Sequence, residues 1–149
     1  EKLASGEILT LGETRYVLVE FMTGVPYNEI FLAVRSLILS GYFPVLAHIE
    51  RYQCLRKSEA IDELIHAGAY MQMNYRCLSR LKGLSERNWC RKQVLEGRIH
   101  LLGTDMHRLD YRPPELAKSL EWLKKRGGEE LAEKLTMENP SAILAGDSL

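Results

Sequence analysis

Four short apolar segments recur along the 149-residue chain at nearly constant spacing, and this repeat constrains the fold most strongly. They are rich in β-branched and aromatic side chains, as strands are, and cover residues 16–19, 43–47, 70–73 and 99–102. With strand starts at residues 15, 43, 70 and 99, the intervals are 28, 27 and 29 residues. This is the length of a strand–helix unit, and it predicts parallel strands joined by right-handed crossovers.

Helical patterns fill the intervals between the predicted strands. The first places Ile30, Phe31, Val34, Leu37 and Ile38 on one face, with Pro26 before the helix and Gly41 just after it. Similar patterns predict helices around residues 61–65, 86–96, 116–123 and 129–135. A last helix is predicted with Asn139 as its N-cap and Gly146 at its end.

Four strand–helix units are too few to close an eight-unit barrel, which needs about 250 residues. A partial α/β barrel and an open doubly wound sheet both remain compatible with the repeat. In either fold, sites form beyond the carboxyl ends of the parallel strands. Metal-type side chains stand at those ends, namely Glu20, His48, Asn74, Asp105 and His107. The placement predicts one shared site.

Composition excludes several other classes of protein. The 20 basic and 20 acidic residues give no net charge, so an overall attraction to nucleic acid or anionic membranes is not expected. The hydrophobic fraction of 46% is that of a single globular domain. Three cysteines without C-x-x-C spacing argue against disulfides and structural zinc. No membrane span or signal-peptide pattern is recognisable, and a cytoplasmic location is expected.

The side chains at the strand ends favour metal-dependent hydrolysis. Carboxylates and neutral imidazoles bind Zn²⁺, Mn²⁺ or Fe²⁺, and such ions lower the pKa of bound water and polarise phosphoryl oxygens. The candidate metal ligands are Glu20, His48, Asp105 and His107. Arg51 and Arg112 are candidate phosphate-binding groups, because guanidinium forks match phosphate geometry.

Each candidate also has a structural interpretation. His48 can be an ordinary buried histidine, Arg51 can pair with a neighbouring acid, and Arg112 can brace the turn that follows it. His66 and His100 are predicted to be structural. The chain contains no Walker loop, dinucleotide fingerprint or G-x-S-x-G elbow. Catalysis by a nucleophilic cysteine is also disfavoured, because no cysteine precedes a loop of the length that cradles phosphate.

Several stretches together resemble one known family. They are YVLVEF (residues 16–21), GYFPVLAHIERY (41–52), GTDMHR (103–108), RPP (112–114) and ENP (138–140). Across nearly the whole chain, the sequence is similar to the manganese-dependent protein-tyrosine phosphatases of the polymerase and histidinol phosphatase (PHP) superfamily. These enzymes occur in bacterial capsule and exopolysaccharide loci.

This resemblance implies a distorted (β/α)7 barrel with a trinuclear metal site and a metal-bound hydroxide as the attacking group. Glu20 would be shared between ions, His48 would bind a second ion, and Asp105 and His107 would supply the last motif. Arg51 and Arg112 would hold the phosphate of the substrate. The metal would be Mn²⁺, with Fe or Zn as alternatives. The substrate would be the phosphotyrosine-rich tail of the cognate tyrosine autokinase that regulates polysaccharide export.

The chain departs from the family pattern at its beginning. Family members open with an H-x-H strand and supply another Glu before Glu20, whereas the first 19 residues here contain no His. Residues 1–149 are therefore interpreted as a single PHP-type domain that lacks the first barrel strands. We expect weak or no activity from it alone, and exposed sheet edges that favour a homo-oligomer. The alternatives are a phosphoesterase for a small metabolite such as histidinol phosphate, and a truncated, non-catalytic binding module.

Overall fold

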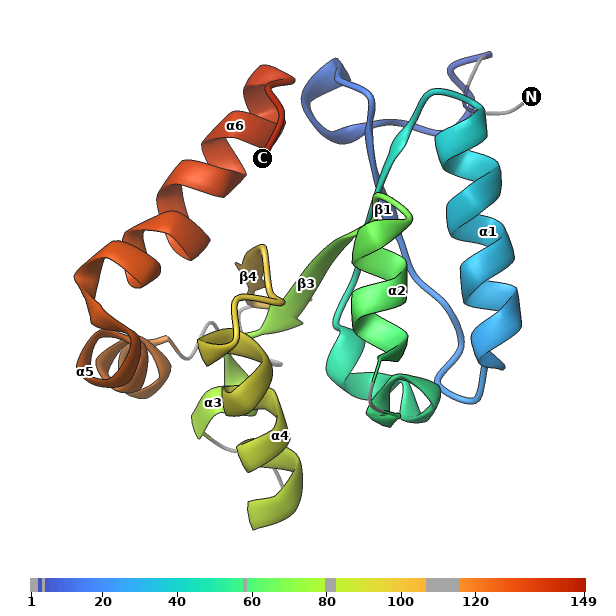
Figure 1. Ribbon diagram of the computed structural model, residues 1–149. Coiled ribbons are helices and arrows are strands. Elements are labelled where there is room, and N and C mark those ends of the chain that lie inside the picture. The colour runs from blue at the N-terminus through green and yellow to red at the C-terminus, as the bar shows by residue number, and fades with distance from the viewer. Residues whose placement is uncertain (1–2, 4, 58, 80–82, 107–115) are drawn as a thin grey trace.

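The computed structural model describes residues 3, 5–57, 59–79, 83–106 and 116–149, and a four-stranded parallel sheet organises them (Figure 1). The strands are β1 (Tyr16–Val19), β2 (Phe43–Leu46), β3 (Tyr70–Asn74) and β4 (Leu101–Gly103). Each strand pairs in parallel with the next one along the chain, in the order β1-β2-β3-β4. The predicted α/β fold with parallel strands is confirmed.

The strand order separates the two architectures that the sequence left open. A doubly wound sheet reverses its strand order at a switch point. The four described strands advance in one direction without such a reversal, which is how the strands of an α/β barrel follow one another. The register pairs Tyr16 with Phe43, Val45 with Tyr70, and Asn74 with Gly103, so the carboxyl ends of all four strands lie along one edge.

Helices connect the strands as the repeat predicted. They are α1 (Tyr27–Leu39), α2 (Ala60–His66), α3 (Arg76–Ser79) and α4 (Leu84–Leu95), with short 3-10 turns at Leu11–Glu13, Ile49–Arg51 (η2) and Gln53–Arg56 (η3). Pro26 precedes α1, where its fixed φ of −67° suits the entry to a helix. Gly41, with φ 84°, reverses the chain after α1 and leads it into β2.

The C-terminal region differs from the prediction in two details. The expected separate helix around residues 129–135 is part of α5 (Ala117–Glu133), which continues past a kink at Gly128 (φ 87°, ψ 166°) into a π-helical turn, Lys134–Glu138. Asn139 is the first residue of α6 (Asn139–Ala145) and not its N-cap, because the residues before it are already helical. Its side chain instead donates to the His100 carbonyl at 2.8 Å. Gly146 ends α6, as predicted.

Two apolar clusters hold the sheet between the helices. The larger cluster lies against α1, α2, α4 and α5 and includes the fully buried Ile30, Leu46, Leu64, Met71, Met73 and Leu123. Burial of each such side chain contributes about 1.5–3 kcal/mol. The smaller cluster joins Tyr16, Val45 and Leu101 to Ile143 of α6. Tyr16 also donates its hydroxyl to the Asp147 carbonyl at 2.7 Å, which fixes the end of the chain to β1.

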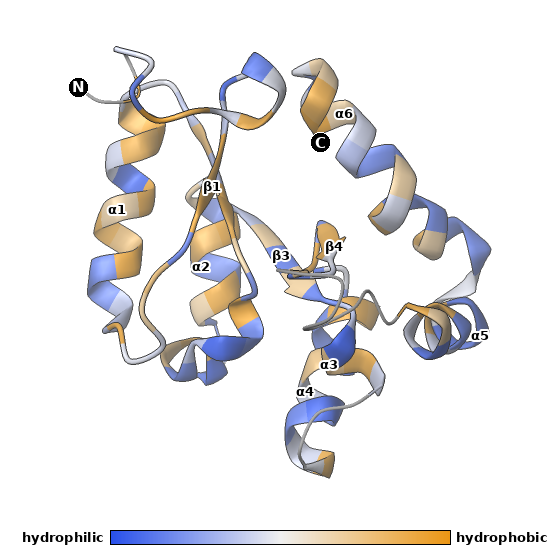
Figure 2. Cartoon of the chain, turned by 180° about the vertical axis from the view of Figure 1, so that it is seen from behind, coloured by the Kyte–Doolittle hydropathy of each residue, from blue (hydrophilic) through white to orange (hydrophobic). Residues whose placement is uncertain are grey.

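The helices differ in character along the chain. Figure 2 shows α1 largely in orange and pale colours and α4 mostly in blue and white. Accordingly α4 buries only Cys90, Gln93 and Val94, which explains its weak apolar periodicity in the sequence. Within the described ranges, no helix combines the length and the apolar character needed to cross a membrane.

Candidate metal centre

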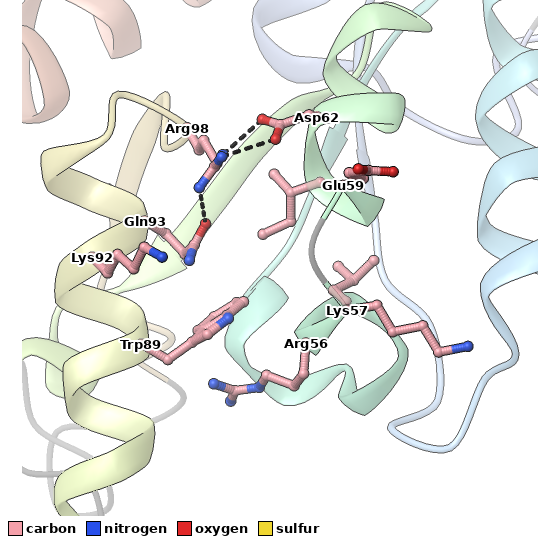
Figure 3. A pocket seen from close by; sticks show the side chains of 10 residues that line it. Arg56, Lys57, Glu59, Asp62, Trp89, Lys92, Gln93 and Arg98 are labelled. Atoms are coloured by element: carbon pink, nitrogen blue, oxygen red, sulfur yellow. Dashed lines mark hydrogen bonds and ion pairs between the residues drawn. The ribbon is translucent and has the colours of Figure 1, made fainter.

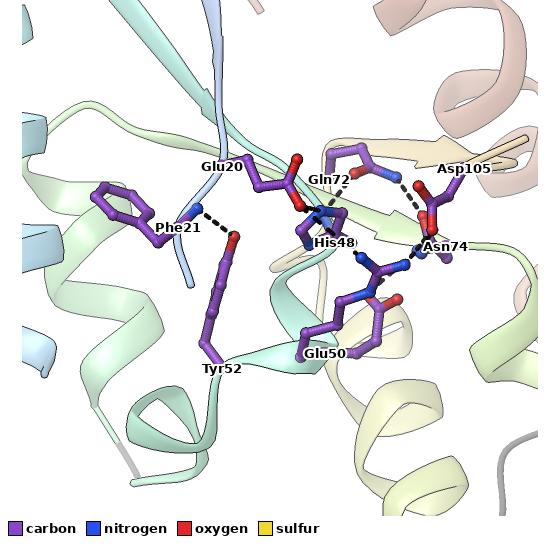
Figure 4. A network of polar contacts seen from close by, with 9 residues as sticks. Glu20, Phe21, His48, Glu50, Tyr52, Gln72, Asn74 and Asp105 are labelled. Atoms are coloured by element: carbon purple, nitrogen blue, oxygen red, sulfur yellow. Dashed lines mark hydrogen bonds and ion pairs between the residues drawn. The ribbon is translucent and has the colours of Figure 1, made fainter. Parts of the chain in front are cut away.

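Three strand ends bring charged side chains together at the carboxyl edge of the sheet (Figure 4). Glu20 directly follows β1, and His48 and Asp105 each stand two residues past β2 and β4. The His48 Nε2 atom lies 2.8 Å from Glu20 Oε1. These are three of the four predicted ligands, and they meet because neighbouring parallel strands end at the same edge.

Arg51 links the acidic side chains of this group. Its Nη1 atom lies 3.9 Å from Glu20 Oε1, and its Nη2 donates to Asp105 Oδ2. The Arg51 side chain is 30% exposed and that of Asp105 is 18% exposed, whereas Glu20 is 65% exposed. Arg51 therefore pairs with acids from two other strand ends. The carboxylates of Glu20 and Asp105 thus stabilise a positive charge that lies between them.

Two of the candidate ligands have an uncommon backbone conformation. His48 has φ 37° and ψ 54°, and Asp105 has φ 51°. Left-handed backbone in residues other than glycine costs about 1–2 kcal/mol, and it is concentrated at functional sites. In each case the turn comes immediately after a strand, so it sets the direction in which the side chain leaves the sheet.

The His48 imidazole fits a metal ligand. The residue is only 5% exposed, and its Nδ1 atom is buried without a hydrogen-bond partner among the described residues. A buried nitrogen without a partner is costly, and imidazole nitrogens are common metal ligands. The other ring nitrogen, Nε2, faces the Glu20 carboxylate. Imidazole nitrogens and carboxylate oxygens, the donor types that His48, Glu20 and Asp105 offer, are those preferred by Zn²⁺, Mn²⁺ or Fe²⁺.

The donor set within the described residues is incomplete. No group of three His, Cys, Asp or Glu side chains in the described ranges converges closely enough to hold an ion. His107 and Arg112, the other predicted ligand and the other predicted phosphate-binding group, lie outside the described residues. The roles of all six site residues stay predictions.

Amide side chains from β3 surround the charged group. Gln72 Oε1 accepts a hydrogen bond from the His48 backbone N–H at 2.5 Å, and Gln72 Nε2 donates to Asn74 Oδ1 at 3.2 Å. Asn74 Nδ2 in turn lies 3.5 Å from Asp105 Oδ2. Sequence reasoning placed Asn74 at a strand end but missed Gln72. The available signal was one polar residue between two buried methionines in a strand.

Glu50 is a buried acid beside the site that sequence reasoning also left without a role. It is 9% exposed and accepts a hydrogen bond from the Asn74 backbone N–H at 3.3 Å. Burial raises the pKa of Glu50 to about 7, although the Asn74 N–H and the charge of Arg51 act in the opposite direction. The carboxyl group therefore changes its protonation near neutral pH.

The remaining described histidines lie away from the strand-end group. His100 Nδ1 accepts a hydrogen bond from the Met71 backbone N–H at 3.0 Å, and its ring stands edge-on to Tyr70 with centroids 5.2 Å apart. His66 lies at the end of α2, with Nδ1 2.7 Å from the Asp62 carbonyl oxygen. Both sets of contacts agree with the structural interpretation.

A separate pocket of about 250 Å³ lies between η3, α2 and α4 (Figure 3). At one end, Arg98 binds both carboxylate oxygens of Asp62, at 2.7 and 2.9 Å. At the other, the Arg56 guanidinium stacks 3.8 Å from the Trp89 ring centroid and donates to the Glu50 carbonyl at 2.7 Å. Arg98 and Asp62 therefore neutralise each other at one end of the pocket, and Arg56 braces η2 beneath the site at the other.

Comparisons with known proteins agree with this architecture. The model of the CpsB/CapC family, described as capsular polysaccharide synthesis, matches residues 1–145. The tyrosine-protein phosphatase CpsB of Streptococcus pneumoniae is 35% identical over 150 residues, which cover 97% of this chain and 62% of that protein. The tyrosine-protein phosphatase YwqE of Bacillus subtilis (strain 168) is 29% identical over 100% of this chain and 59% of its own length.

A solved structure shares the fold. It has a TM-score of 0.88 and 28% sequence identity, and the match covers 99% of this chain and 60% of the other. It comes from crystal structures of YwqE from B. subtilis and CpsB from S. pneumoniae, described as unique metal-dependent tyrosine phosphatases. The chain spans about three fifths of the length of these relatives. It belongs to the CpsB/CapC family of capsular polysaccharide synthesis.

Proposed function

We propose that this chain forms part of a metal-dependent phosphotyrosine-protein phosphatase that acts in the regulation of capsule or exopolysaccharide synthesis. The observation that carries the proposal is the meeting of Glu20, His48 and Asp105 around Arg51 at the carboxyl edge of the sheet. The names of the relatives as tyrosine phosphatases support the same reaction.

The proposed cofactor is a set of divalent ions, with Mn²⁺ expected and Fe or Zn as alternatives. Glu20, His48 and Asp105 would hold them, with His107 as a further ligand. Bound ions of this kind lower the pKa of water and neutralise charge on a phosphoryl group. The His48 imidazole, whose Nε2 faces Glu20, and the two carboxylates provide donor atoms of the kind that such ions need.

Arg51 has the proposed role of binding the substrate phosphate. Its guanidinium is already directed by Asp105 and Glu20 to the point where the strand ends meet. Metal ions bound to these carboxylates would displace Arg51 from them, and the freed guanidinium would offer a planar fork to a phosphate dianion. Arg112 has the same proposed role from the segment after β4.

Substitution of Arg51 tests this assignment. In the full-length protein with Mn²⁺, Arg51→Lys should lower kcat/KM on a phosphotyrosine peptide by about 100-fold, because the charge remains but the fork is lost. Arg35→Lys on the exposed side of α1 is the matched control and should leave turnover unchanged. Equal activity of the wild type and Arg51→Lys would contradict the role.

The choice of substrate is tested on the wild type. We expect hydrolysis of phosphotyrosine peptides to exceed that of histidinol phosphate by at least an order of magnitude in kcat/KM, and to stop when the metal is removed by a chelator. The proposed natural substrate is a phosphotyrosine-bearing bacterial tyrosine autokinase, and the proposed location of the phosphatase is the cytoplasm. Faster turnover of histidinol phosphate would instead support the small-metabolite phosphoesterase.

A further inference from the structure

We propose that Gln72 is a positioning residue that fixes the two candidate ligands His48 and Asp105, which follow different strands. In this proposal residue 103 is a glycine because any side chain there would collide with Gln72. Gln72 lies on β3, between β2, which leads to His48, and β4, which leads to Asp105. Its side chain is an uncharged amide. This role rests on the proposed metal site, but the contacts that support it are independent of any reaction.

The hydrogen bonds of Gln72 run in one direction through the site. A backbone N–H can only donate, so the Gln72 atom facing His48 N must be the carbonyl oxygen. The Gln72 amino group then donates to Asn74 Oδ1, and the Asn74 amino group points to the Asp105 carboxylate, which can only accept. The two ends of the chain thus determine the orientation of both amides without conflict.

The contact with His48 acts where the backbone is under strain. His48 has left-handed φ and ψ angles, and Gln72 accepts its N–H at 2.5 Å. Residues other than glycine keep such a conformation only where surrounding contacts impose it. Because the ring direction of His48 follows from this turn, the Gln72 bond also determines how Nε2 faces Glu20.

Gly103 has a steric explanation that connects it to Gln72. A Cβ atom at residue 103 would lie 2.4 Å from Gln72 Nε2 and 3.2 Å from its Cδ. Gly103 is not among the glycines with positive φ, so its backbone does not require glycine. A flexible side chain could ordinarily move away, but Gln72 is held at both its oxygen and its nitrogen. Any side chain at 103 must therefore break those bonds.

Gln72 and Asn74 together therefore connect the carboxyl ends of β2, β3 and β4 at the site. Gln72 holds the turn after β2, and Asn74 reaches the turn after β4. Partners that orient metal ligands typically change metal affinity by 10–100-fold when they are removed. We therefore expect Gln72 to influence metal binding although it is not a ligand.

Variants of the full-length protein test the role. Gln72→Met keeps the length of the side chain and removes both hydrogen bonds, and Gly103→Ala displaces the amide without altering it. Each should weaken Mn²⁺ binding, followed by the electron paramagnetic resonance signal of free Mn²⁺, by about tenfold or more. The double variant should be little worse than either single variant, because both remove the same contacts.

Gln93→Met is the matched control, since Gln93 is also buried but binds Arg98 away from the site. It should leave Mn²⁺ affinity unchanged. In the metal-free protein, NMR hydrogen exchange of the His48 amide should be faster in Gln72→Met than in the wild type. This measurement reports on Gln72 even if the protein hydrolyses no phosphotyrosine.

Unchanged Mn²⁺ affinity and unchanged His48 exchange in Gln72→Met would overturn the proposal. An equal loss of affinity in Gln93→Met would overturn it too, because the effect would then reflect general stability. Fully additive effects of the two substitutions would show that Gly103 and Gln72 act separately and would refute their pairing. If Gly103→Ala does not fold, Gln72→Met decides the positioning role alone.

Discussion

His48 combines a strained backbone with a buried ring, and the two properties can be separated by substitution. Asparagine tolerates left-handed angles better than most residues, so His48→Asn should keep the free energy of unfolding within about 1 kcal/mol of the wild type. It should nevertheless weaken Mn²⁺ binding by at least tenfold, because the imidazole is lost. Chemical denaturation and metal titration measure the two effects.

His48→Val provides the contrast for that variant. A β-branched residue resists the left-handed turn, so the loss of stability should exceed that of His48→Asn by about 1–2 kcal/mol. If His48→Asn bound Mn²⁺ as tightly as the wild type, the assignment of His48 as a ligand would be wrong.

His100 makes stability depend on pH. Burial, and secondarily the charge of Lys134, lowers the pKa of His100 to about 4 from 6.5. Its Nδ1 already accepts the Met71 N–H, so protonation there would break this bond. In the unfolded chain His100 binds a proton below about pH 6.5, whereas in the folded chain it stays neutral down to about pH 4. Stability should therefore fall through this window as pH decreases, by about 3 kcal/mol at most.

Substitution of His100 isolates this contribution. The free energy of unfolding, measured between pH 7 and 4, should fall less steeply in His100→Gln than in the wild type, because no imidazole remains to titrate. Parallel curves for the two proteins would show that His100 does not cause the pH dependence.

At the scale of secondary structure, Gly68 joins α2 to β3 beneath α1. Its φ of 101° is unfavourable for any other residue, and a Cβ there would lie 2.8 Å from Ile38 Cδ1. Gly68→Ala should therefore lower the free energy of unfolding by about 1–3 kcal/mol. Gly24→Ala is the control, since Gly24 has ordinary φ and nothing within 4 Å of its Cβ position. Equal denaturation midpoints for the two variants would contradict this account.

The first three strands could be predicted from sequence to within one residue, because each is a short apolar run between turn residues, whereas the strand predicted at residues 99–102 is β4 at Leu101–Gly103. The predicted strand at residues 16–19 is β1 itself, and the predicted helix after Pro26 is α1. The C-terminal helices were harder because their boundaries depend on tertiary packing. Gly128 kinks α5 without ending it, and the Asn139 side chain binds the carbonyl of a distant residue, His100, and not its own helix.

The same distinction applies to the site. The positions of Glu20, His48 and Asp105 followed from strand ends alone, since parallel strands finish at one edge. Gln72 could not be identified in this way. Its proposed positioning role depends on the register of β4 beside β3 and on the space that Gly103 leaves for its side chain. Both involve residues about 30 positions apart in the sequence, so no local pattern reveals them.

At the scale of the whole molecule, the relatives are longer than this chain, which covers 62% of CpsB from S. pneumoniae. The described residues supply three of the predicted ligands and no group of three that could hold an ion by itself. We expect the 149-residue chain with added Mn²⁺ to hydrolyse an aryl phosphate at least 100-fold more slowly than CpsB from S. pneumoniae. Comparable specific activities of the two would refute this expectation.

The sequential order of the four strands also affects how the chain can fold. Each strand pairs with its immediate predecessor, so each new pairing closes a loop of fewer than 30 residues. Short loops cost little closure entropy, and contacts between near neighbours in sequence speed folding. The sheet can therefore assemble in the order of synthesis on the ribosome, with the turn at His48 formed before β4 arrives with Asp105.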